Sequence, residues 1–459
     1  MSSTAYHCEL AWLGGDTAAA DVLVEVTDGV ISTVREGVAA PAGAVSLRGV
    51  TLPGFANAHS HAFHRALRGR THAGTGSFWT WRDQMYGLAE RLTPASYRAL
   101  ARAVYGEMVL AGITAVGEFH YLHHDTGGVP YAQPNAMGEA LIAAARDAGL
   151  RIALLDTCYL HGGVGADGVP IAPNEVQRRF SDGSAAAWAD RVDALADTYH
   201  DDPYVHVGAA IHSVRAVDPF AMRAVANWAA ARKAPLHAHV SEQPAENEQC
   251  LAAHGMTPTA MLAVANALSP RFTSVHATHL TAHDIERHQT HGCTVCFCPT
   301  TERDLADGIG PSGALRDAGV ALALGSDSHA VIDPFEEMRA LELNERLATL
   351  RRGNHEVDAI LHAATAEGYR SLGWDSGGVL AEGAVADFVT VGLGSVRLAG
   401  IDAEHALAGV VYAAAPADVH HVVVGGEVVV REGRHVRIDV GLALRDAIAA
   451  LDDEGLVGS

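Results

Sequence analysis

Between residues 50 and 380, short apolar runs alternate with longer amphipathic stretches. This order is typical of strands that alternate with helices, which makes the strands parallel neighbours in one sheet. Eight apolar runs fit buried strands, at residues 52–58, 114–119, 151–157, 205–211, 235–240, 273–277, 294–298 and 320–325. Helical patterns follow them, at residues 94–111, 135–148, 185–199, 219–231, 244–266, 282–288, 312–318 and 334–350. Eight such units predict an α/β fold of the (β/α)8 TIM-like barrel type.

The two ends of the chain follow a different pattern. The segments "DVLVEVTDGVISTVREG" and "HVVVGGEVVVREGRHV" alternate apolar and polar residues around Asp28-Gly29 and Gly425-Gly426. This alternation predicts hairpins with tight turns. Because neither end is long enough for a stable sheet of its own, we expect residues 1–50 and 380–459 to form one small β-sandwich domain. The barrel would then occupy residues 51–379.

Composition narrows the class of protein. The chain has 459 residues, of which 49% are hydrophobic and 19% charged, so disorder is excluded. Its net charge of −22 would repel both nucleic-acid backbones and anionic lipid surfaces. No leader pattern and no uninterrupted run of 18 apolar residues occurs, and the six cysteines are too sparse for a disulfide framework. We therefore expect a cytoplasmic protein that binds neither nucleic acid nor membrane.

Two residue types point to the chemistry. Lys233 is the single lysine, so the chain has no phosphate-binding loop of the GxxxxGK[ST] type. The 27 histidines are far above ordinary usage, and several occur in close pairs. His59 and His61 lie two residues apart at the end of the first predicted strand. Residues at this spacing point to the same face of a strand, so both imidazoles could bind one metal ion.

Three further strands end in residues that can bind metal. The fifth strand carries "HAHVSE", with His237 and His239, the sixth carries "SVHATHL", with His276 and His279, and the eighth ends in "GSDS", with Asp327. In a barrel of this type the carboxyl ends of all strands meet at one rim, where active sites are built. Surface histidines without a common role would instead be scattered over helices and loops. These motifs therefore predict one metal site.

With these motifs the chain resembles the amidohydrolase superfamily, and specifically its deaminase branch. The resemblance implies one divalent metal bound by His59, His61, His239 and Asp327, since Glu242 follows His239 by the three residues that the branch requires. His237 is then a structural strand residue. Binuclear members carry a bridging lysine on the fourth strand, where this chain has none, which implies a single ion. Three imidazoles and a carboxylate suit zinc, although iron and manganese also fit.

The resemblance also implies catalytic roles. A metal-activated water attacks the substrate, Glu242 transfers the proton to the leaving nitrogen, and His276 and Asp327 orient the reacting groups. His276 is preferred to His279 because it lies at the end of the apolar run. The alternative role for Glu242 is an exposed carboxylate at a helix N-terminus.

Four blocks, "FANAHSHAFHRA", "SFWTWRDQMY", "GEFHYLHH" and "CPTTERDLADGIGP", resemble the formimidoylglutamate deiminase family. That family hydrolyses N-formimino-L-glutamate, a small dicarboxylate of histidine degradation, to N-formyl-L-glutamate and ammonia. The resemblance implies substrate contacts from Arg82, in a long loop after the first strand, from Arg215 and His212 after the fourth, and from Tyr121 after the second. Arginine binds carboxylates through two parallel hydrogen bonds. His64 is a fifth candidate contact, although it stands where the family is expected to have glutamine.

Three alternatives remain open at this point. The chain could be a deaminase of a neutral heterocycle such as guanine, whose pocket would favour amides and aromatic residues over paired arginines. It could be an imidazolonepropionase, which is also metal-dependent. It could also be a metal-binding protein without turnover, although Glu242 and His276 beside the ligands argue against this. Because barrels with a terminal β domain commonly pair, we expect a homodimer.

Overall fold

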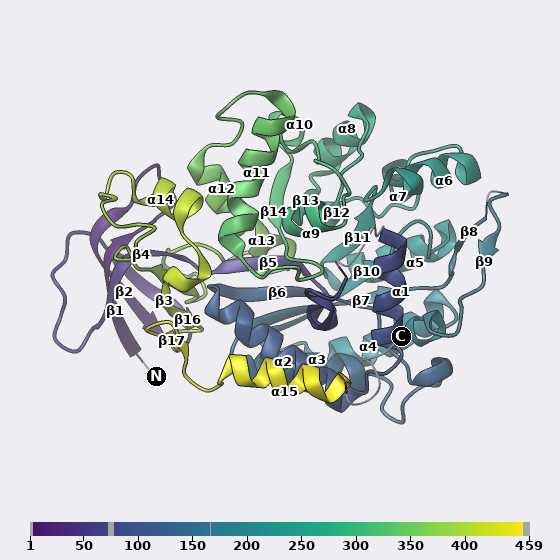
Figure 1. The fold of residues 1–459 in the computed structure, drawn as a ribbon, viewed down its shortest axis with the longest axis horizontal. Helices are drawn as coiled ribbons and strands as arrows, with labels where there is room; N and C mark the ends of the chain where they lie inside the picture. The colour runs from purple at the N-terminus through teal and green to yellow at the C-terminus, as the bar shows by residue number, and fades with distance from the viewer. Residues whose placement is uncertain (1–2, 72–77, 166, 453–459) are drawn as a thin grey trace.

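A computed structural model describes residues 3–71, 78–165 and 167–452. Its larger part is a barrel of eight parallel strands, as predicted (Figure 1). In spatial order these strands are β5 (Phe55–Ser60), β6 (Ile113–His120), β7 (Arg151–Cys158), β10 (Val205–Ile211), β11 (Leu236–Val240), β12 (Phe272–His276), β13 (Thr294–Phe297) and β14 (Ala321–Leu324). A parallel bridge between Ser60 and Asp327 joins the first strand to the segment after the last. The carboxyl ends of all eight strands therefore surround one mouth.

Helices cover the outside of the barrel. They are α2 (Pro94–Leu110), α3 (Ala136–Ala148), α4 (Ala185–Tyr199), α5 (Pro219–Arg232), α6 (Pro244–His254), α7 (Pro258–Val264), α8 (Ala282–His291), α9 (Pro299–Asp304), α10 (Ser312–Asp317), α11 (Pro334–Thr349), α12 (Val357–Ala364) and α13 (Ala366–Ser371). The helix predicted over 244–266 is divided in two, because Gly255 ends α6 in a left-handed conformation and Thr257 caps α7. No helix in the described part of the chain is long and apolar enough to cross a membrane.

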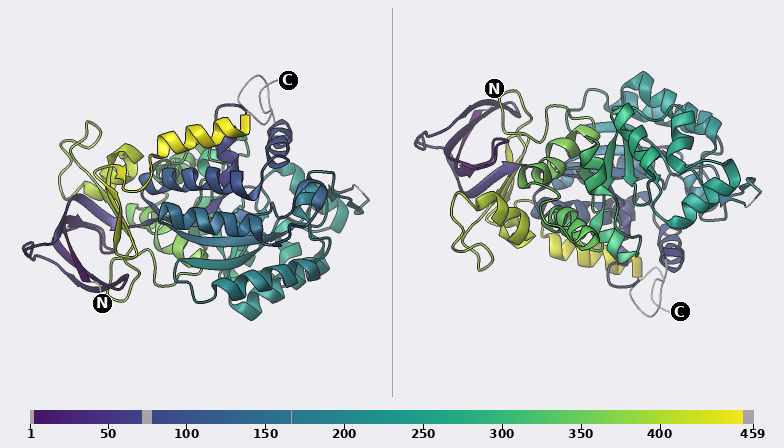
Figure 2. Two further views of the ribbon diagram at one scale, coloured as in Figure 1. Left: turned by 90° about the horizontal axis from the view of Figure 1, so that it is seen from below. Right: turned by 90° about the horizontal axis from the view of Figure 1, so that it is seen from above.

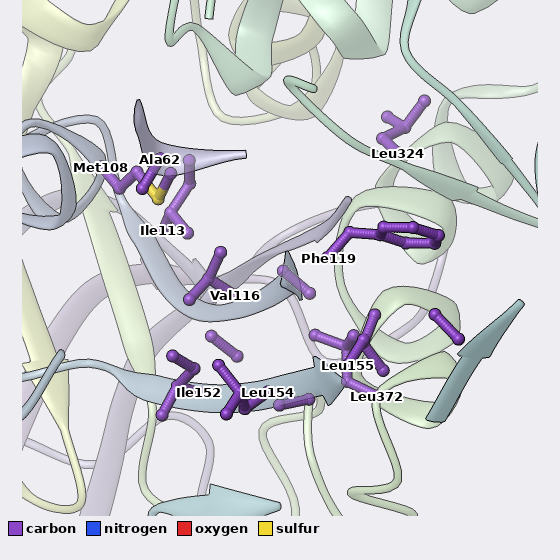
Figure 3. Packing of buried hydrophobic residues seen from close by; sticks show 14 of the residues in the cluster. Ala62, Met108, Ile113, Val116, Phe119, Ile152, Leu154, Leu155, Leu324 and Leu372 are labelled. Atoms are coloured by element: carbon purple, nitrogen blue, oxygen red, sulfur yellow. The ribbon is translucent and has the colours of Figure 1, made fainter. Parts of the chain in front are cut away.

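The barrel strands are buried on both faces. Every residue of β6 and of β7 is buried, because helices cover the outer face and the strands' own side chains fill the interior. Figure 3 shows part of this core, with Ile113 and Val116 on β6 and Ile152 and Leu154 on β7. This packed core holds the strand ends at fixed positions around the mouth.

The first strand begins later than predicted. The apolar run 52–58 is shared between two sheets, because Leu52 and Pro53 end β4 (Val45–Pro53) and the barrel strand starts at Phe55. Gly54 lies at the crossing, where a Cβ atom would come within 2.0 Å of Thr114 Oγ1. A continuous apolar run conceals this break, since both halves are buried.

Both ends of the chain build a second, mixed sheet (Figure 1). Its strands, in spatial order, are β18 (Arg434–His435), β17 (Glu427–Arg431), β16 (Val419–Val424), β15 (Phe388–Val391), β4, β1 (Ser3–Ala11), β2 (Ala19–Thr27) and β3 (Val30–Arg35). The sheet folds over a core of its own, where the rings of Tyr6 and Phe388 meet edge to face at 5.0 Å. The predicted hairpins at Asp28-Gly29 and Gly425-Gly426 are confirmed, and all four turn residues have positive φ.

The two sheets are joined by a buried ion pair. Asp387, just before β15, accepts hydrogen bonds from Arg151 Nε at 2.6 Å and from Tyr369 Oη at 2.6 Å. Its other oxygen accepts the backbone N–H of Gly425.

The C-terminal helix α15 (Val440–Leu451) leaves the terminal sheet and packs along α2 on the outside of the barrel (Figure 2).

Candidate metal centre and active site

Four buried side chains converge where β5, β11 and β14 end. His59 lies on β5, His61 directly follows that strand, His239 lies on β11 and Asp327 follows β14. The Oδ1 atom of Asp327 is 3.3 Å from His59 Nε2 and 3.5 Å from His61 Nε2. The Nε2 atoms of His59 and His239 are 3.2 Å apart. The tertiary structure thus brings together the four residues predicted as metal ligands.

This geometry fits a divalent metal ion. Two ligands about 2.1 Å from one tetrahedral zinc ion lie about 3.4 Å apart, close to the separations in this cluster. The Nδ1 atoms of His61 and His239 face the carbonyl oxygens of Phe119 and His212, each at 2.9 Å. A carbonyl can only accept, so both Nδ1 atoms carry the proton and both Nε2 lone pairs face the centre. Burial holds the pKa of His61 and of His239 well below the usual value, which keeps both rings neutral, as metal binding requires.

Asp327 supplies the negative charge of the cluster. Burial alone would raise the pKa of Asp327, but the adjacent His59 imidazole lowers it below its usual value. The carboxylate is held in place by its own backbone, because its N–H donates to the carbonyl of His59 at 3.0 Å. The residue has a left-handed φ of 41°. Asp327 is therefore an ionised carboxylate at a fixed position.

Glu242, predicted to transfer the proton, and His276, predicted to orient the reacting groups, lie next to the cluster. His276 Nε2 is 3.8 Å from Glu242 Oε1 and 3.9 Å from Asp327 Oδ2. On its other side, His276 Nδ1 faces Glu302 Oε1 at 3.5 Å. Although burial opposes it, these carboxylates raise the pKa of His276 well above the usual value. Burial also raises the pKa of Glu242, which makes this carboxylate a better proton acceptor.

His237 and His279, the two histidines that the sequence analysis did not assign to the site, lie outside the cluster. His237 Nε2 donates to the carbonyl of Ser371 at 2.9 Å. His279 Nε2 donates to the carbonyl of Asp307 at 2.8 Å. Neither ring belongs to the cluster around Asp327.

A cavity of about 230 Å³ opens onto this cluster. All five residues predicted to contact the substrate line it: His64, Arg82, Tyr121, His212 and Arg215. His64 Nε2 and Tyr121 Oη form a hydrogen bond of 2.9 Å. Burial, together with the nearby Arg215 and Arg82, lowers the pKa of His212 to about 3, so this ring is neutral. The cavity wall near His212 therefore owes its positive charge to the two arginines.

The segment that carries Arg82 is a helix and not the loop that we predicted. It forms α1 (Phe78–Ala89), in which no glycine or proline occurs before Gly87. The guanidinium of Arg82 lies over the Tyr86 ring, four residues further along the helix, at 5.5 Å. Arg215 follows β10, as predicted, and its Nε atom is buried without a hydrogen-bond partner in the described part of the chain.

Several residues of the site were not predicted. Tyr159 and Phe180 line the cavity, and the buried Gln177 donates to the hydroxyls of Tyr159 and Tyr86 at 2.8 and 3.0 Å. The glycine-rich segment after β7 forms the short hairpin of β8 (Gly163–Val164) and β9 (Pro170–Ile171), which also reaches the cavity. Glu302 and Asp307 lie within "CPTTERDLADGIGP", so their presence in a family-like block was the available signal.

A second histidine cluster lies beneath the loop after β6. His120, His123 and Asp156 place possible ligand atoms within 4.8 Å of one another. However, both oxygens of Asp156 accept hydrogen bonds from the guanidinium of Arg191, each at 2.8 Å. A resident cation already neutralises this carboxylate, so the cluster does not fit a second metal ion.

Comparison with known proteins shows the family of this chain. The model of the amidohydrolase family matches residues 50–429. The chain is 36% identical to a formimidoylglutamate deiminase from Pseudomonas aeruginosa, over 89% of this chain and 90% of that protein. It is 32% identical to a 5-methylthioadenosine/S-adenosylhomocysteine deaminase from Halobacterium salinarum, over 90% of this chain and 88% of that protein. An amidohydrolase structure from Brucella melitensis superposes with a TM-score of 0.90 at 34% identity, covering 98% of this chain and 99% of that one.

Proposed function

Because the chain belongs to the amidohydrolase family, we propose that it hydrolyses N-formimino-L-glutamate to N-formyl-L-glutamate and ammonia, as a step of histidine degradation. One divalent ion, with zinc as the first candidate, would be held by His59, His61, His239 and Asp327. The observation that carries the proposal is the position of Arg82 and Arg215, which line the same cavity as Glu242 and the metal cluster.

Charge explains why the two arginines matter. The proposed substrate has two carboxylates, whereas the protein as a whole has a net charge of −22. A dianionic substrate therefore needs local cations, and arginine can bind each carboxylate through two parallel hydrogen bonds. A neutral heterocycle carries no anionic group for these two guanidinium groups to bind.

Each residue of the site has its own role in the proposed hydrolysis. A divalent ion in the cluster supplies Lewis-acid activation of water. Glu242 accepts a proton from the attacking water and donates it to the nitrogen that leaves as ammonia. His276 and Asp327 hold the developing tetrahedral carbon in position, with His276 as hydrogen-bond donor. Arg82, Arg215 and the paired His64 and Tyr121 orient the substrate so that its formimino carbon faces the cluster.

The test compares three substrates and three arginine variants. We expect the metal-loaded protein to release ammonia from N-formimino-L-glutamate, and neither to deaminate guanine nor to hydrolyse imidazolone propionate. Removing one partner of a buried charged contact costs about 2–5 kcal/mol. Arg82→Ala and Arg215→Ala should therefore each lower kcat/KM for N-formimino-L-glutamate by about 30- to 5000-fold.

The exposed Arg352→Ala is the matched control and should leave kcat/KM unchanged. Full activity of both cavity variants on N-formimino-L-glutamate would refute the carboxylate contacts. Turnover of guanine that survives in the same two variants would instead identify the protein as a deaminase of a neutral heterocycle.

A further inference from the structure

Asp307 lies beside the catalytic groups, in a loop between α9 and α10 that the mechanism above leaves unused. Its side chain is only 2% exposed. The loop is fixed on both sides of the residue, since Asp307 N–H donates to the carbonyl of Glu302 at 2.8 Å and its own carbonyl accepts from His279. One carboxyl oxygen accepts a hydrogen bond from the side chain of Gln243, the neighbour of Glu242 in sequence. Asp307 is therefore held rigidly next to the proton-transfer residue.

The other carboxyl oxygen, Oδ2, is buried and has no hydrogen-bond partner in the described part of the chain. Asp307, Glu242 and His276 place ligand atoms within 4.8 Å of one another. Burial and the nearby Glu242 carboxyl raise the pKa of Asp307 to about 9. The surroundings thus oppose a second negative charge at this position. A ligand group that donates hydrogen bonds, or carries positive charge, would relieve that cost.

The cluster is compact enough for one nitrogen to contact two of its members. Two acceptor atoms that each lie about 2.9 Å from one tetrahedral nitrogen are about 4.7 Å apart. The nitrogen that leaves in the proposed reaction carries several N–H bonds. Glu242 gives it one proton, and its remaining N–H groups need acceptors. Asp307, within 4.8 Å of Glu242 and His276, has the carboxyl oxygen Oδ2 without a partner in the described part of the chain.

Resting on the proposed function, we infer that Asp307 and Glu242 together form a binding site for the leaving nitrogen of the substrate. In its ionised form, which the positive charge of a protonated formimino group favours, Asp307 accepts an N–H of that group and later of ammonia, while Gln243 holds its carboxyl in position. The site selects leaving groups that carry N–H bonds. Asp307 is in this sense a further catalytic residue, distinct from the residues that bind the carboxylates.

The test uses substrate and product as a matched pair. N-formyl-L-glutamate has both carboxylates of the substrate but lacks the leaving nitrogen. Loss of one hydrogen bond to a charged group commonly costs about 10- to 100-fold. In the metal-loaded Asp307→Asn protein we expect kcat/KM for N-formimino-L-glutamate to fall by that factor. We expect the Kd of N-formyl-L-glutamate, measured by calorimetry, to stay within about twofold of wild type, and product inhibition by ammonium to weaken.

The exposed Asp317→Asn serves as the matched control and should change none of these values. The inference is overturned if kcat/KM of Asp307→Asn stays within twofold of wild type. It is also overturned if the variant binds N-formyl-L-glutamate more weakly than wild type by the same factor as its loss in kcat/KM. Should Asp307→Asn fail to fold, Gln243→Met takes its place, with an expected three- to tenfold loss in kcat/KM and unchanged product binding. Unchanged kcat/KM in Gln243→Met would then overturn the inference. A wild-type protein that releases no ammonia from N-formimino-L-glutamate would refute the proposed function itself, which separates the two failures.

Discussion

His237 and His239 show how one strand separates a metal ligand from a structural residue. The two imidazoles lie two positions apart on β11, yet His239 Nε2 faces His59 while His237 donates to the carbonyl of Ser371. Residues at this spacing lie on the same face of a strand, so the position along β11 separates the two roles. The two histidines therefore offer a matched pair for testing the metal site.

Replacing His239 by alanine should remove the metal and the activity together, because one of four ligands is lost. His237→Ala should keep the metal, since its ring does not belong to the cluster. Elemental analysis of both purified variants measures this, and wild type should hold one ion per chain. Two ions per active chain, or metal loss in His237→Ala, would contradict the assignment.

Glu242→Gln keeps the size of the side chain but removes the carboxylate that transfers the proton. Loss of a general acid or base commonly slows a reaction about 10²- to 10⁴-fold. We expect kcat to fall within this range while the metal content stays at the wild-type value. Near wild-type turnover in the metal-loaded variant would show that another group is the base.

At the scale of elements, α4 is tied to β7 by a buried charge network. Arg191 on α4 binds Asp156 on β7, and its Nε donates to Asp182 at 2.8 Å. Although burial opposes it, hydrogen bonds from His124 and Arg191 lower the pKa of Asp182 well below its usual value. Burial also raises the pKa of Asp156, but the adjacent Arg191 lowers it more, so the pKa lies below its usual value. The network holds the loop after β6, which carries Tyr121.

The sign of the resulting pH dependence follows from these lowered values. Near pH 4 the unfolded chain binds more protons than the folded chain, so the network stabilises at neutral pH and loses this contribution as pH falls below about 4. For metal-free wild type, we expect the free energy of unfolding in urea to drop more steeply from pH 5 to pH 3 than for metal-free Asp182→Asn. Parallel profiles for the two proteins would contradict this.

At the scale of the whole molecule, Asp387 connects the terminal sheet to the barrel. It binds Arg151 and Tyr369 of the barrel and Gly425 of the terminal hairpin. Asp387→Ala leaves the guanidinium of Arg151 buried without its partner, which commonly costs about 3–5 kcal/mol. Urea denaturation should show this loss in the free energy of unfolding.

Glu427→Ala is the control for Asp387→Ala, because Glu427 pairs with Arg437 at the exposed surface. Loss of an exposed pair costs at most about 1 kcal/mol. Equal, small effects in the two variants would mean that the buried pair does not stabilise the joint between the sheets.

The sequence by itself determined the secondary structure that depends on the pattern of neighbouring residues. Strand and helix patterns follow from the alternation of apolar and polar residues, so the eight barrel strands and both terminal hairpins could be predicted. Because parallel strands end at one rim, His59, His239 and Asp327 could be placed near one another from their positions at strand ends. The break at Gly54, the helix around Arg82 and the division of 244–266 escaped prediction, since each depends on contacts with distant segments or on local turns within an amphipathic run.

Only the tertiary structure decided which polar residues complete the site. Glu302 lies on α9 and Asp307 in the loop that follows it. No periodicity marks either residue, yet packing brings them to His276 and Glu242. The same holds for Gln177, which links two tyrosine hydroxyls from separate elements. Local patterns are set by the preferences of neighbouring residues, whereas the environment of a buried polar atom is set by residues far away in sequence, and these meet only in the folded chain.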